Sequence, residues 1–427
     1  FFRFFGEKSC IGKLNLRNMK YILKVFSFSN LLVFCSLFII ISIIQSCDDG
    51  GVELYTLDVR NIDYNNIVLS EMADDVTYTS LANDSPIEIY YDTKVFKDHI
   101  IINGRINGIS IYDRKGHFIR QVGSKGRGPG EYYFCTNIAV DYEGKRVYVR
   151  DSHDIKVYNL DGNFIRSFDI IQHAGQHIGD SRGYENFFSD IVYFKPHLFV
   201  ATYISGGRAY NDWVVIDTFG NLVSEKLNYI PGFGSYRGWG GVTYEYKDKI
   251  YYHNHYNDTL FSVSRDLSYG PSMILDFGVT IPETKEWEQE DNRKRFLSDI
   301  NEMFETDRYW IMLCSREQQD YEEMYVIVDK ETKKSYLMYD REPSESNYGP
   351  IYTGGIFNDL DGGVPFQPEG RYEENGREYM LELVSPFTLK SHIASDDFKN
   401  SVPKYPEKKE KLIELANSLD EMDNLIL

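Results

Sequence analysis

Residues 111–120, with the sequence IYDRKGHFIR, recur as VYNLDGNFIR over residues 157–166. A third copy, VIDTFGNLV, covers residues 215–223. Each copy consists of an apolar run, a turn that contains glycine, and a second run in which apolar and polar residues alternate. This pattern is typical of a β-hairpin. The chain is therefore expected to be built from repeats of one antiparallel unit.

Two further strand-like segments precede each hairpin, so the unit holds four strands. They are residues 87–91 and 99–102 in the first unit, 138–141 and 147–150 in the second, and 191–194 and 198–203 in the third. Weaker units follow at residues 242–263, 309–339 and 356–393. Six such units predict an all-β fold, a six-bladed β-propeller of four-stranded antiparallel blades. The hairpins disfavour a β-helix, and a β-sandwich would not predict one repeated four-strand unit.

Smaller elements are expected outside the blades. Residues 282–303 begin at a proline and are rich in Glu, Arg and Lys, which predicts a small helical insertion between the fourth and fifth units. Apolar residues at helical spacing predict a short C-terminal helix over residues 404–419. Residues 425–427 are expected to add a closing strand, joined by residues 54–59 from the other end. We thus expect a propeller over residues 47–403, followed by a C-terminal segment at 404–427.

The first 46 residues have the pattern of a targeting segment. Residues 1–18 lack Met and are interpreted as a non-native upstream extension. Residues 19–46 hold two lysines, then an apolar run that ends at Ser46-Cys47. This resembles a bacterial lipobox, in which Cys47 is diacylated and becomes the mature N-terminus, although Gln45 departs from the pattern. The alternative is an uncleaved transmembrane anchor, since residues 25–44 are long enough to span a bilayer.

Both interpretations attach the protein to a membrane and place the rest of the chain outside the cytoplasm. Asp48 and Asp49 resemble the acidic export signal of surface lipoproteins in Bacteroidetes. In other Gram-negative groups, an Asp directly after the Cys is a signal for retention at the inner membrane. We expect an outer-membrane lipoprotein on the cell surface or the periplasmic face.

The repeats and the segment that follows the first hairpin resemble a known family. Residues 122–132, VGSKGRGPGEY, and residues 257–261, NDTLF, are similar to motifs of the Bacteroidetes six-bladed β-propeller lipoproteins, which are related to NHL and TolB-like propellers. The resemblance covers most of residues 52–427. One departure is Asp423-Asn424-Leu425, where members often have Asp-Asn-Pro. The resemblance implies an extracytoplasmic propeller and little about chemistry, because one fold hosts many functions.

Composition excludes several classes of protein. The formal net charge of -19 argues against a nucleic-acid partner, because phosphate backbones require clustered Lys and Arg. Five cysteines are too few for a disulfide scaffold. Outside the targeting segment only Cys135 and Cys314 remain besides Cys47; two buried thiols are favoured over one disulfide.

No catalytic motif is present, and no cofactor is expected. Residues 126–130 lack the ending of a phosphate-binding loop, and Pro129 removes an amide donor, so they predict a tight inter-blade turn from which Arg127 could face the central channel. His253 and His255 lie on the same side of a predicted strand, but no third ligand completes a metal site. We expect no metal there and favour a polar cluster at the blade end. Residues 359–362 resemble the start of a Ca²⁺ loop, but the Glu that should end it is Gly370, which favours a turn.

Residues 229–241, YIPGFGSYRGWGG, form a loop rich in aromatic residues and glycine. Tyr236, Arg237 and Trp239 are groups that stack on sugars or anchor peptides. Alternatively, they cap the hydrophobic seam between two blades. Weaker candidates for the same face are Asp190, Trp213 and Tyr244.

These observations favour a non-enzymatic binding or scaffold module. It would be anchored to the membrane by its N-terminal lipid and would hold a glycan or peptide ligand, or an outer-membrane transporter partner. The alternative is a propeller enzyme, a hydrolase or lyase acting on a glycan or peptide, with its site in the central channel.

Overall fold

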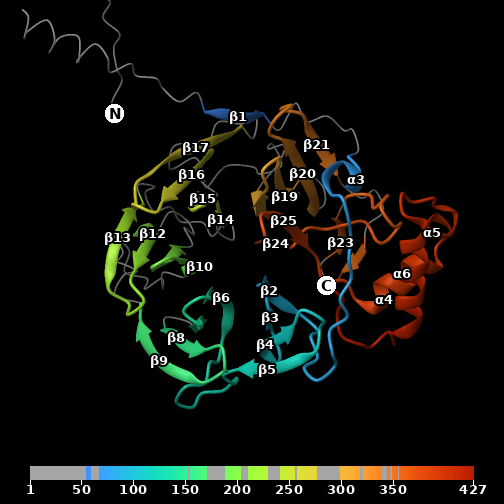
Figure 1. Ribbon diagram of the computed structural model, residues 1–427. Coiled ribbons are helices and arrows are strands. Elements are labelled where there is room, and N and C mark those ends of the chain that lie inside the picture. The colour runs from blue at the N-terminus through green and yellow to red at the C-terminus, as the bar shows by residue number, and fades with distance from the viewer. Residues whose placement is uncertain are drawn as a thin grey trace, which may run out of the picture. The chain divides into compact units, whose positions relative to one another are not determined.

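Five antiparallel sheets, each with four consecutive strands, surround a common axis in the computed structural model (Figure 1). This confirms the predicted all-β propeller with four-stranded blades. The structure describes residues 54–58, 67–151, 154–170, 188–202, 210–228, 241–254, 257–276, 299–317, 321–338, 344–346, 349–353 and 355–427.

The blades follow the order of the chain. Blade 1 consists of β2 (Tyr90–Val95), β3 (His99–Gly104), β4 (Gly108–Asp113) and β5 (Phe118–Val122). Blade 2 consists of β6 (Cys135–Asp141), β7 (Arg146–Asp151), β8 (Asp154–Asn159) and β9 (Phe164–Asp169). Blade 3 consists of β10 (Phe188–Phe194), β11 (His197–Thr202), β12 (Asn211–Ile216) and β13 (Leu222–Leu227).

The last two blades carry additional strands. Blade 4 consists of β14 (Gly241–Tyr246), β15 (Lys249–Asn254), β16 (Thr259–Ser264) and β17 (Tyr269–Asp276), and β1 (Tyr55–Asp58) pairs with β17 in parallel. Blade 5 consists of β18 (Asp299–Glu305), β19 (Tyr309–Glu317), β20 (Tyr321–Asp329) and β21 (Ser335–Met338). Two short strands, β22 (Ser344–Ser346) and β23 (Gly349–Thr353), join blade 5 through a parallel pairing with β20.

The hydrophobic core lies between neighbouring blades. The first strand of each blade is innermost, and β2, β6, β10, β14 and β18 contact one another in sequence around the axis. The second and third strands are the most buried; all six residues of β12 are buried, for example. One apolar cluster joins blades 1 and 2, and another joins blades 4 and 5. Cys135 and Cys314 lie in these two separate clusters as buried free thiols.

The predicted sixth blade is wrong: the sixth position holds a hairpin of only two strands, β24 (Gly370–Glu374) and β25 (Arg377–Leu381). β24 contacts β2 of blade 1. Pro365 and Pro368 lie in the segment before the hairpin and cannot donate to a strand ladder. After the hairpin, Pro386 begins a helix at the point where a further strand was expected.

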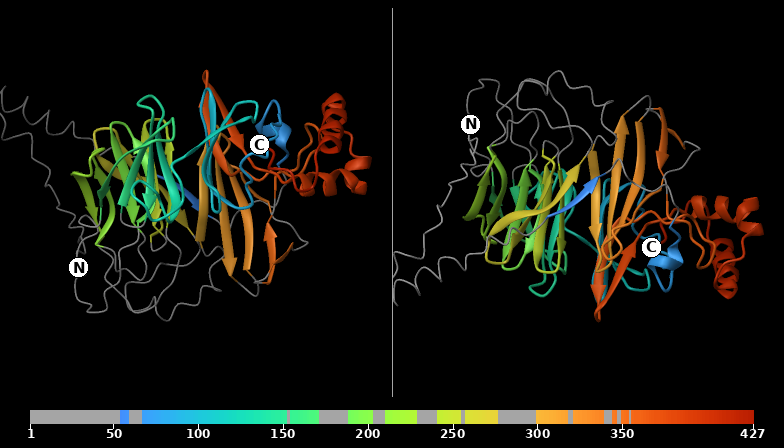
Figure 2. Two further views of the ribbon diagram at one scale, coloured as in Figure 1. Left: turned by 90° about the horizontal axis from the view of Figure 1, so that it is seen from below. Right: turned by 90° about the horizontal axis from the view of Figure 1, so that it is seen from above.

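Three helices follow the hairpin: α4 (Pro386–Ala394), α5 (Asp396–Asn400) and α6 (Pro406–Ser418). Figure 2 shows them beside the sheets rather than within the ring. The structure confirms the C-terminal helix, but the strand predicted up to residue 393 is helix α4. The hydroxyl of Ser385 accepts a hydrogen bond from the Thr388 amide, and proline occupies the first turn, so this segment has the signals that start a helix.

Two other expectations need correction. Residues 299–303 of the predicted helical insertion belong to β18, the innermost strand of blade 5, and the remainder, residues 282–298, lies outside the described residues. β1 pairs with blade 4 and not with the C-terminus. Residues 425–427 pair instead with residues 79–81, and Ile426 also pairs with Val384. The chain end therefore links the segment before blade 1 to the segment after the hairpin.

The antiparallel order gives the propeller two different faces. Turns between the first and second strands and between the third and fourth strands lie on one face, which we call the turn face. The connections between blades, such as residues 123–134, begin and end on the opposite face, which we call the loop face. In the part of the chain that the structure describes, no helix is long and apolar enough to cross a membrane.

Candidate functional site

The innermost strands of four blades share a β-bulge at the same place near the loop face. The pairing of the first two strands shifts between Tyr90 and Asp92, and likewise in blades 2, 3 and 5. A bulge redirects the side chains that follow it. The residue directly after the shift is polar in every case: Asp92, Asn137, Asp190 and Glu302.

These polar side chains converge near the axis with two others. Lys94 forms an ion pair with Asp92, with Nζ 3.0 Å from Oδ2, and it also interacts electrostatically with Asp190 and Glu245 from blades 3 and 4. Glu302 of blade 5 interacts with Asp92. We call Asp92, Lys94, Asp190, Glu245 and Glu302 the axial cluster.

The axial cluster is enclosed by protein but open to water. Acids from blades 1, 3 and 4 surround Lys94, yet 45% of the surface of its side chain is accessible to solvent. The side chain of Glu245 is 40% exposed. The axis therefore admits water and does not have a packed apolar core, so polar groups there are available to a ligand.

Burial and neighbouring carboxylates raise the pKa values of acids in the axial cluster and in the segment after β25. Burial raises the pKa of Glu302 to about 8, and the nearby carboxylates of Glu369, Glu323 and Asp92 act in the same direction. Burial, followed by the charge of Glu369, also raises the pKa of Glu382 to about 8. Burial raises the pKa of Asp190, opposed mainly by Lys94.

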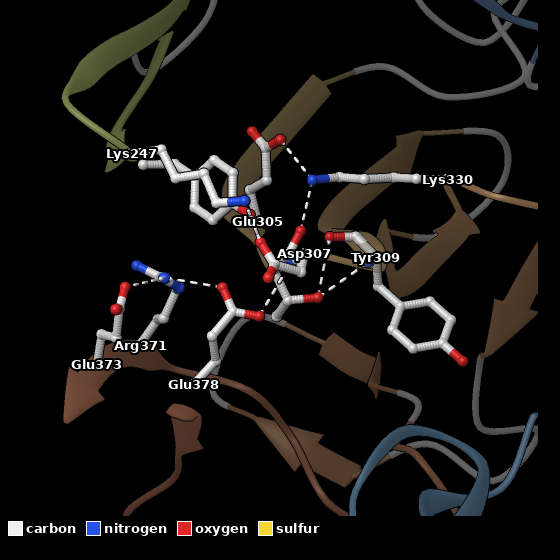
Figure 3. A network of polar contacts seen from close by, with 10 residues as sticks. Lys247, Glu305, Asp307, Tyr309, Lys330, Arg371, Glu373 and Glu378 are labelled. Atoms are coloured by element: carbon white, nitrogen blue, oxygen red, sulfur yellow. Dashed lines mark hydrogen bonds and ion pairs between the residues drawn. The ribbon is translucent and has the colours of Figure 1, made fainter. Parts of the chain in front are cut away.

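On the turn face, a network of charges links blades 4 and 5 to the two-stranded hairpin (Figure 3). Lys247, in a turn of blade 4, pairs with Asp307, in a turn of blade 5. The Asp307 amide donates to Glu378 of the hairpin over 2.7 Å, and Glu378 accepts a hydrogen bond from Arg371 over 2.9 Å. Side-chain contacts of this kind attach the hairpin where a full blade would pack by its sheet.

On the loop face, an aromatic rim stands directly before an innermost strand. Tyr133 and Phe134, each 56% exposed, precede the first residue of β6. Asp151 accepts hydrogen bonds from both of their backbone amides, which fixes the start of the strand. The guanidinium of Arg127 lies 4.5 Å from the centre of the Tyr133 ring. We call Arg127, Tyr133 and Phe134 the aromatic rim.

The candidate residues from the sequence occupy different surroundings. Arg127 is exposed and belongs to the aromatic rim. His253 is 3% exposed in β15, and its Nε2 lies 2.8 Å from the carbonyl oxygen of Asn257. The structure therefore places these two residues in separate parts of the molecule. Four other candidates lie outside the described residues: Tyr236, Arg237, Trp239 and His255.

Of the weaker candidates, Asp190 joins the axial cluster. Trp213 is fully buried between blades 3 and 4, and Tyr244 is buried with its hydroxyl donating to Glu305 over 2.9 Å. Among the described residues, no group of three His, Cys, Asp or Glu side chains is arranged to hold a metal ion.

The sequence holds a signal for the axial cluster. One polar residue occupies the equivalent place in four innermost strands, within the segments YDT, TNI, SDI and NEM. Alignment of the first strands, in addition to the hairpins, would have identified this position. It could not identify Lys94 or Glu245, because each of these occurs in a single blade.

Comparison with known proteins gives the family. The chain belongs to the family described as Domain of unknown function (DUF4934), whose model matches residues 54–427. No curated protein matched the chain.

Solved structures share the fold. The structure of a "Putative exported protein" from Bacteroides fragilis has a TM-score of 0.55 and 16% sequence identity, covering 85% of this chain and 96% of that one. BamB from Moraxella catarrhalis has a TM-score of 0.39 and 12% identity, covering 71% of this chain and 95% of that one. At these identities the likeness to the first structure shows the fold alone.

Proposed function

We propose that this member of the family is an extracytoplasmic binding module that holds a ligand at the propeller axis. The observation that carries the proposal is the polar residue that follows a bulge in four blades. Several blades thus direct a polar group toward one water-accessible place, where these groups can reach a ligand. The aromatic rim on the loop face adds flat groups that pack against a ligand.

The charge of the axial cluster favours one ligand class over another. At neutral pH its negative charge comes from Asp92, Asp190 and Glu245, because Glu302 keeps its proton. Two cations oppose them: Lys94, and Arg265, which lies 3.1 Å from Glu245, so an excess of negative charge remains. Such a site attracts positive charge and repels anions. We therefore propose a peptide with basic side chains as the ligand, in preference to a neutral glycan.

Titration of the full-length protein in detergent with trilysine, followed by calorimetry, tests this proposal. Asp92→Asn and Asp190→Asn should each weaken binding by about tenfold, because each removes a partly desolvated charge. Lys94→Gln should strengthen binding, because it removes the competing cation. Glu331→Gln, at an exposed position in a turn of blade 5, serves as the control and should have no effect.

Two other results would contradict a basic peptide as the ligand. If a neutral tetrasaccharide bound as tightly as trilysine, and if neither Asp variant changed trilysine binding, the axis would not select cations. A tetrasaccharide that bound while trilysine did not would favour the glycan.

We further propose that a lipid on Cys47 anchors the module at the outer membrane, where a transporter is its partner. The support is the lipobox-like sequence and the acidic pair after it. Cys47→Ser should move the protein from the membrane fraction to the soluble fraction and abolish acylation detected by mass spectrometry. Persistence of the variant in the membrane would contradict the lipid anchor. Co-purification from solubilised outer membranes tests the partner, and recovery of the protein without a transporter would contradict it.

One observation favours an enzyme as a second candidate. Carboxyl groups with a pKa of about 8, such as Glu302 and Glu382, remain protonated at neutral pH and are suited to general acid catalysis. An enzyme would release product from a peptide or glycan mixture, and Glu302→Gln would abolish that release while trilysine binding persisted. If the wild-type protein released no product, the result would contradict the enzyme and favour the binding module.

A further inference from the structure

A cavity of about 260 Å³ lies on the turn face between blades 1 and 2, away from the axial cluster. Blade 1 contributes residues of β3, β4 and β5, and blade 2 contributes the ends of β7 and β8 with the turns beside them. The lining combines apolar side chains with charged ones. The residues that matter for its chemistry are Ile111, Ile119, Arg120, Lys145, Arg146 and Asp161.

The repeat explains why the groove is open at this place. Asp161 occupies the same turn position in blade 2 as Phe219 does in blade 3. Between blades 2 and 3, the ring of Phe219, which is 68% exposed, lies over the guanidinium of Arg166 at 4.7 Å. Arg120 is the counterpart of Arg166, but it meets the small carboxylate of Asp161 at 2.7 Å. The smaller side chain leaves Arg120 without an aromatic ring over it.

The cavity is positively charged in a protein whose net charge is -19. Asp161 neutralises Arg120, which leaves Lys145 and Arg146 as the excess cations. No carboxylate among the described residues forms an ion pair with either of them. Nη1 of Arg146 donates to the carbonyl oxygens of Gly144 and Lys145 over 3.2 and 3.1 Å, so its side chain is held at the turn.

His99 adds a group of defined tautomer to the lining. Its Nδ1 lies 2.8 Å from the hydroxyl oxygen of Tyr142, in a hydrogen bond whose direction depends on the tautomer of the ring. The same hydroxyl lies 3.3 Å from Oδ2 of Asp98. In the charged ring both nitrogens carry a hydrogen, so Nε2 can then donate to an anion.

We propose that this cavity, independent of the axial site, binds a small organic anion. The anionic group meets Lys145 and Arg146, and an apolar face of the ligand rests on Ile111 and Ile119. The volume suits a ligand the size of a single sugar acid or an aromatic acid, at the lower limit of small-molecule sites. A sugar acid and an aromatic acid both offer an anionic group and an apolar face, so an experiment must distinguish between them.

Titration of the full-length protein with D-glucuronate and with benzoate tests the proposal, each beside its neutral counterpart, D-glucose or benzyl alcohol. At least one anion should bind about tenfold more tightly than its neutral counterpart. The anion that binds more tightly shows whether the site takes a sugar acid or an aromatic acid. Lys145→Gln and Arg146→Gln should each weaken that binding by about threefold to fivefold. Lys411→Gln, the same change on helix α6, is the matched control and should leave binding unchanged.

Two changes at Asp161 give opposite signs and sharpen the test. Asp161→Asn frees Arg120 from its partner and should strengthen binding of the anion. Asp161→Phe copies the residue that blade 3 uses at this position and should fill the cavity and abolish binding. If Asp161→Phe failed to fold, Asp161→Asn, Lys145→Gln and Arg146→Gln would still test whether the cavity binds an anion.

Equal binding of anions and neutral counterparts would overturn the proposal. So would weaker binding by Asp161→Asn, or a loss in Lys411→Gln as large as that in Lys145→Gln. None of these outcomes bears on trilysine binding at the axis, because the cavity and the axial cluster share no residue.

Discussion

Single residues explain why the glycine-rich run after the first hairpin has its sequence. The carboxylate of Glu131 accepts a hydrogen bond from the Gly128 amide over 2.7 Å, so the loop's own side chain occupies the place that an anion would take. A Cβ on Gly126 would lie 1.9 Å from Oε2 of Glu131. Gly130 has a φ of 77°, a conformation that favours glycine. These residues therefore form the tight inter-blade turn that the sequence predicts.

Asn424 is the residue on which we expect the contact between the C-terminal segment and the segment before blade 1 to depend most. Its side chain accepts from the Ile87 amide over 2.9 Å and donates to the carbonyl oxygens of Ala82 and Ser85 over 2.9 and 3.0 Å. Asn424→Ala leaves these largely buried groups unpaired, which should lower the free energy of unfolding by about 3 kcal/mol. Urea denaturation measures the loss. Asn163→Ala, at an exposed turn position, should cost less than about 0.5 kcal/mol; equal losses would contradict the role of Asn424.

Glu302 should make the protein less stable as the pH rises. Its folded pKa of about 8 lies above the ordinary value of 4.5, so between these values the folded state keeps a proton that the unfolded state has lost. Stability falls across that window. Glu302→Gln mimics the protonated form and should match the wild type near about pH 4 but exceed it near about pH 9 in urea denaturation. Glu331→Gln should show no such divergence, and a constant gap for Glu302→Gln at all pH values would contradict the shift.

Elements were predictable where the sequence repeats and not where it departs from the repeat. The three hairpins were found because their turns carry glycine at equivalent positions, such as Gly116, Gly162 and Gly220, all of which have positive φ. The charged composition of residues 282–303 predicts a helix, although residues 299–303 belong to β18 and include the polar sequence DINE. Glu302 of this sequence belongs to the axial cluster, so the pattern that identifies buried strands fails for an innermost strand of this kind.

The sequence predicts a full blade at the sixth position, where the structure has a two-stranded hairpin held by contacts that are not local. The hairpin β24–β25 is attached by side chains such as Glu378, which accepts from Asp307 across 71 positions of the chain. No periodicity reveals a link of this kind. For the same reason, the sequence pattern could show the polar position in four innermost strands but could not show that Lys94 meets acids from two other blades.

The contact between Lys330 and Glu305 should be the most costly element of the turn-face network to remove. Nζ of Lys330 lies 2.6 Å from Oε1 of Glu305, whose residue is only 6% exposed, and 4.6 Å from the ring centre of Tyr246. Lys330→Ala leaves a buried charge without its cation and should lower the free energy of unfolding by about 3 kcal/mol. Lys334→Ala, in the same turn but exposed, should change it by less than about 0.5 kcal/mol.

A double change separates loss of the charge pair from loss of packing. Lys330→Met with Glu305→Gln keeps most of the volume and removes both charges, so it should recover part of the stability lost in Lys330→Ala. If the double variant were less stable than Lys330→Ala, packing and not the unpaired charge would explain the cost.

The molecule as a whole separates charge between its surfaces. The axial cluster is acidic, while the cavity between blades 1 and 2 on the turn face is basic. The repeat makes both features. Equivalent positions in several blades supply the polar residues at the axis, and a variable turn position, Lys115, Asp161 and Phe219 in blades 1 to 3, has a small side chain beside the cavity. A rigid ring can thus hold two ligands of opposite charge without a change of fold.

The acidic axis makes binding of a cationic peptide dependent on pH. Glu302, with a pKa of about 8, gains negative charge as the pH rises from about 6 to about 9, while the lysine side chains of trilysine stay protonated. The affinity for trilysine should therefore rise over this range, in contrast to the stability of the free protein, which falls. Calorimetry at several pH values measures the slope, and Glu302→Gln should reduce it. A cation bound beside Glu302 must lower the pKa of this residue, so its affinity must depend on pH. If the affinity of the wild type for trilysine did not change with pH, the peptide would not reach Glu302.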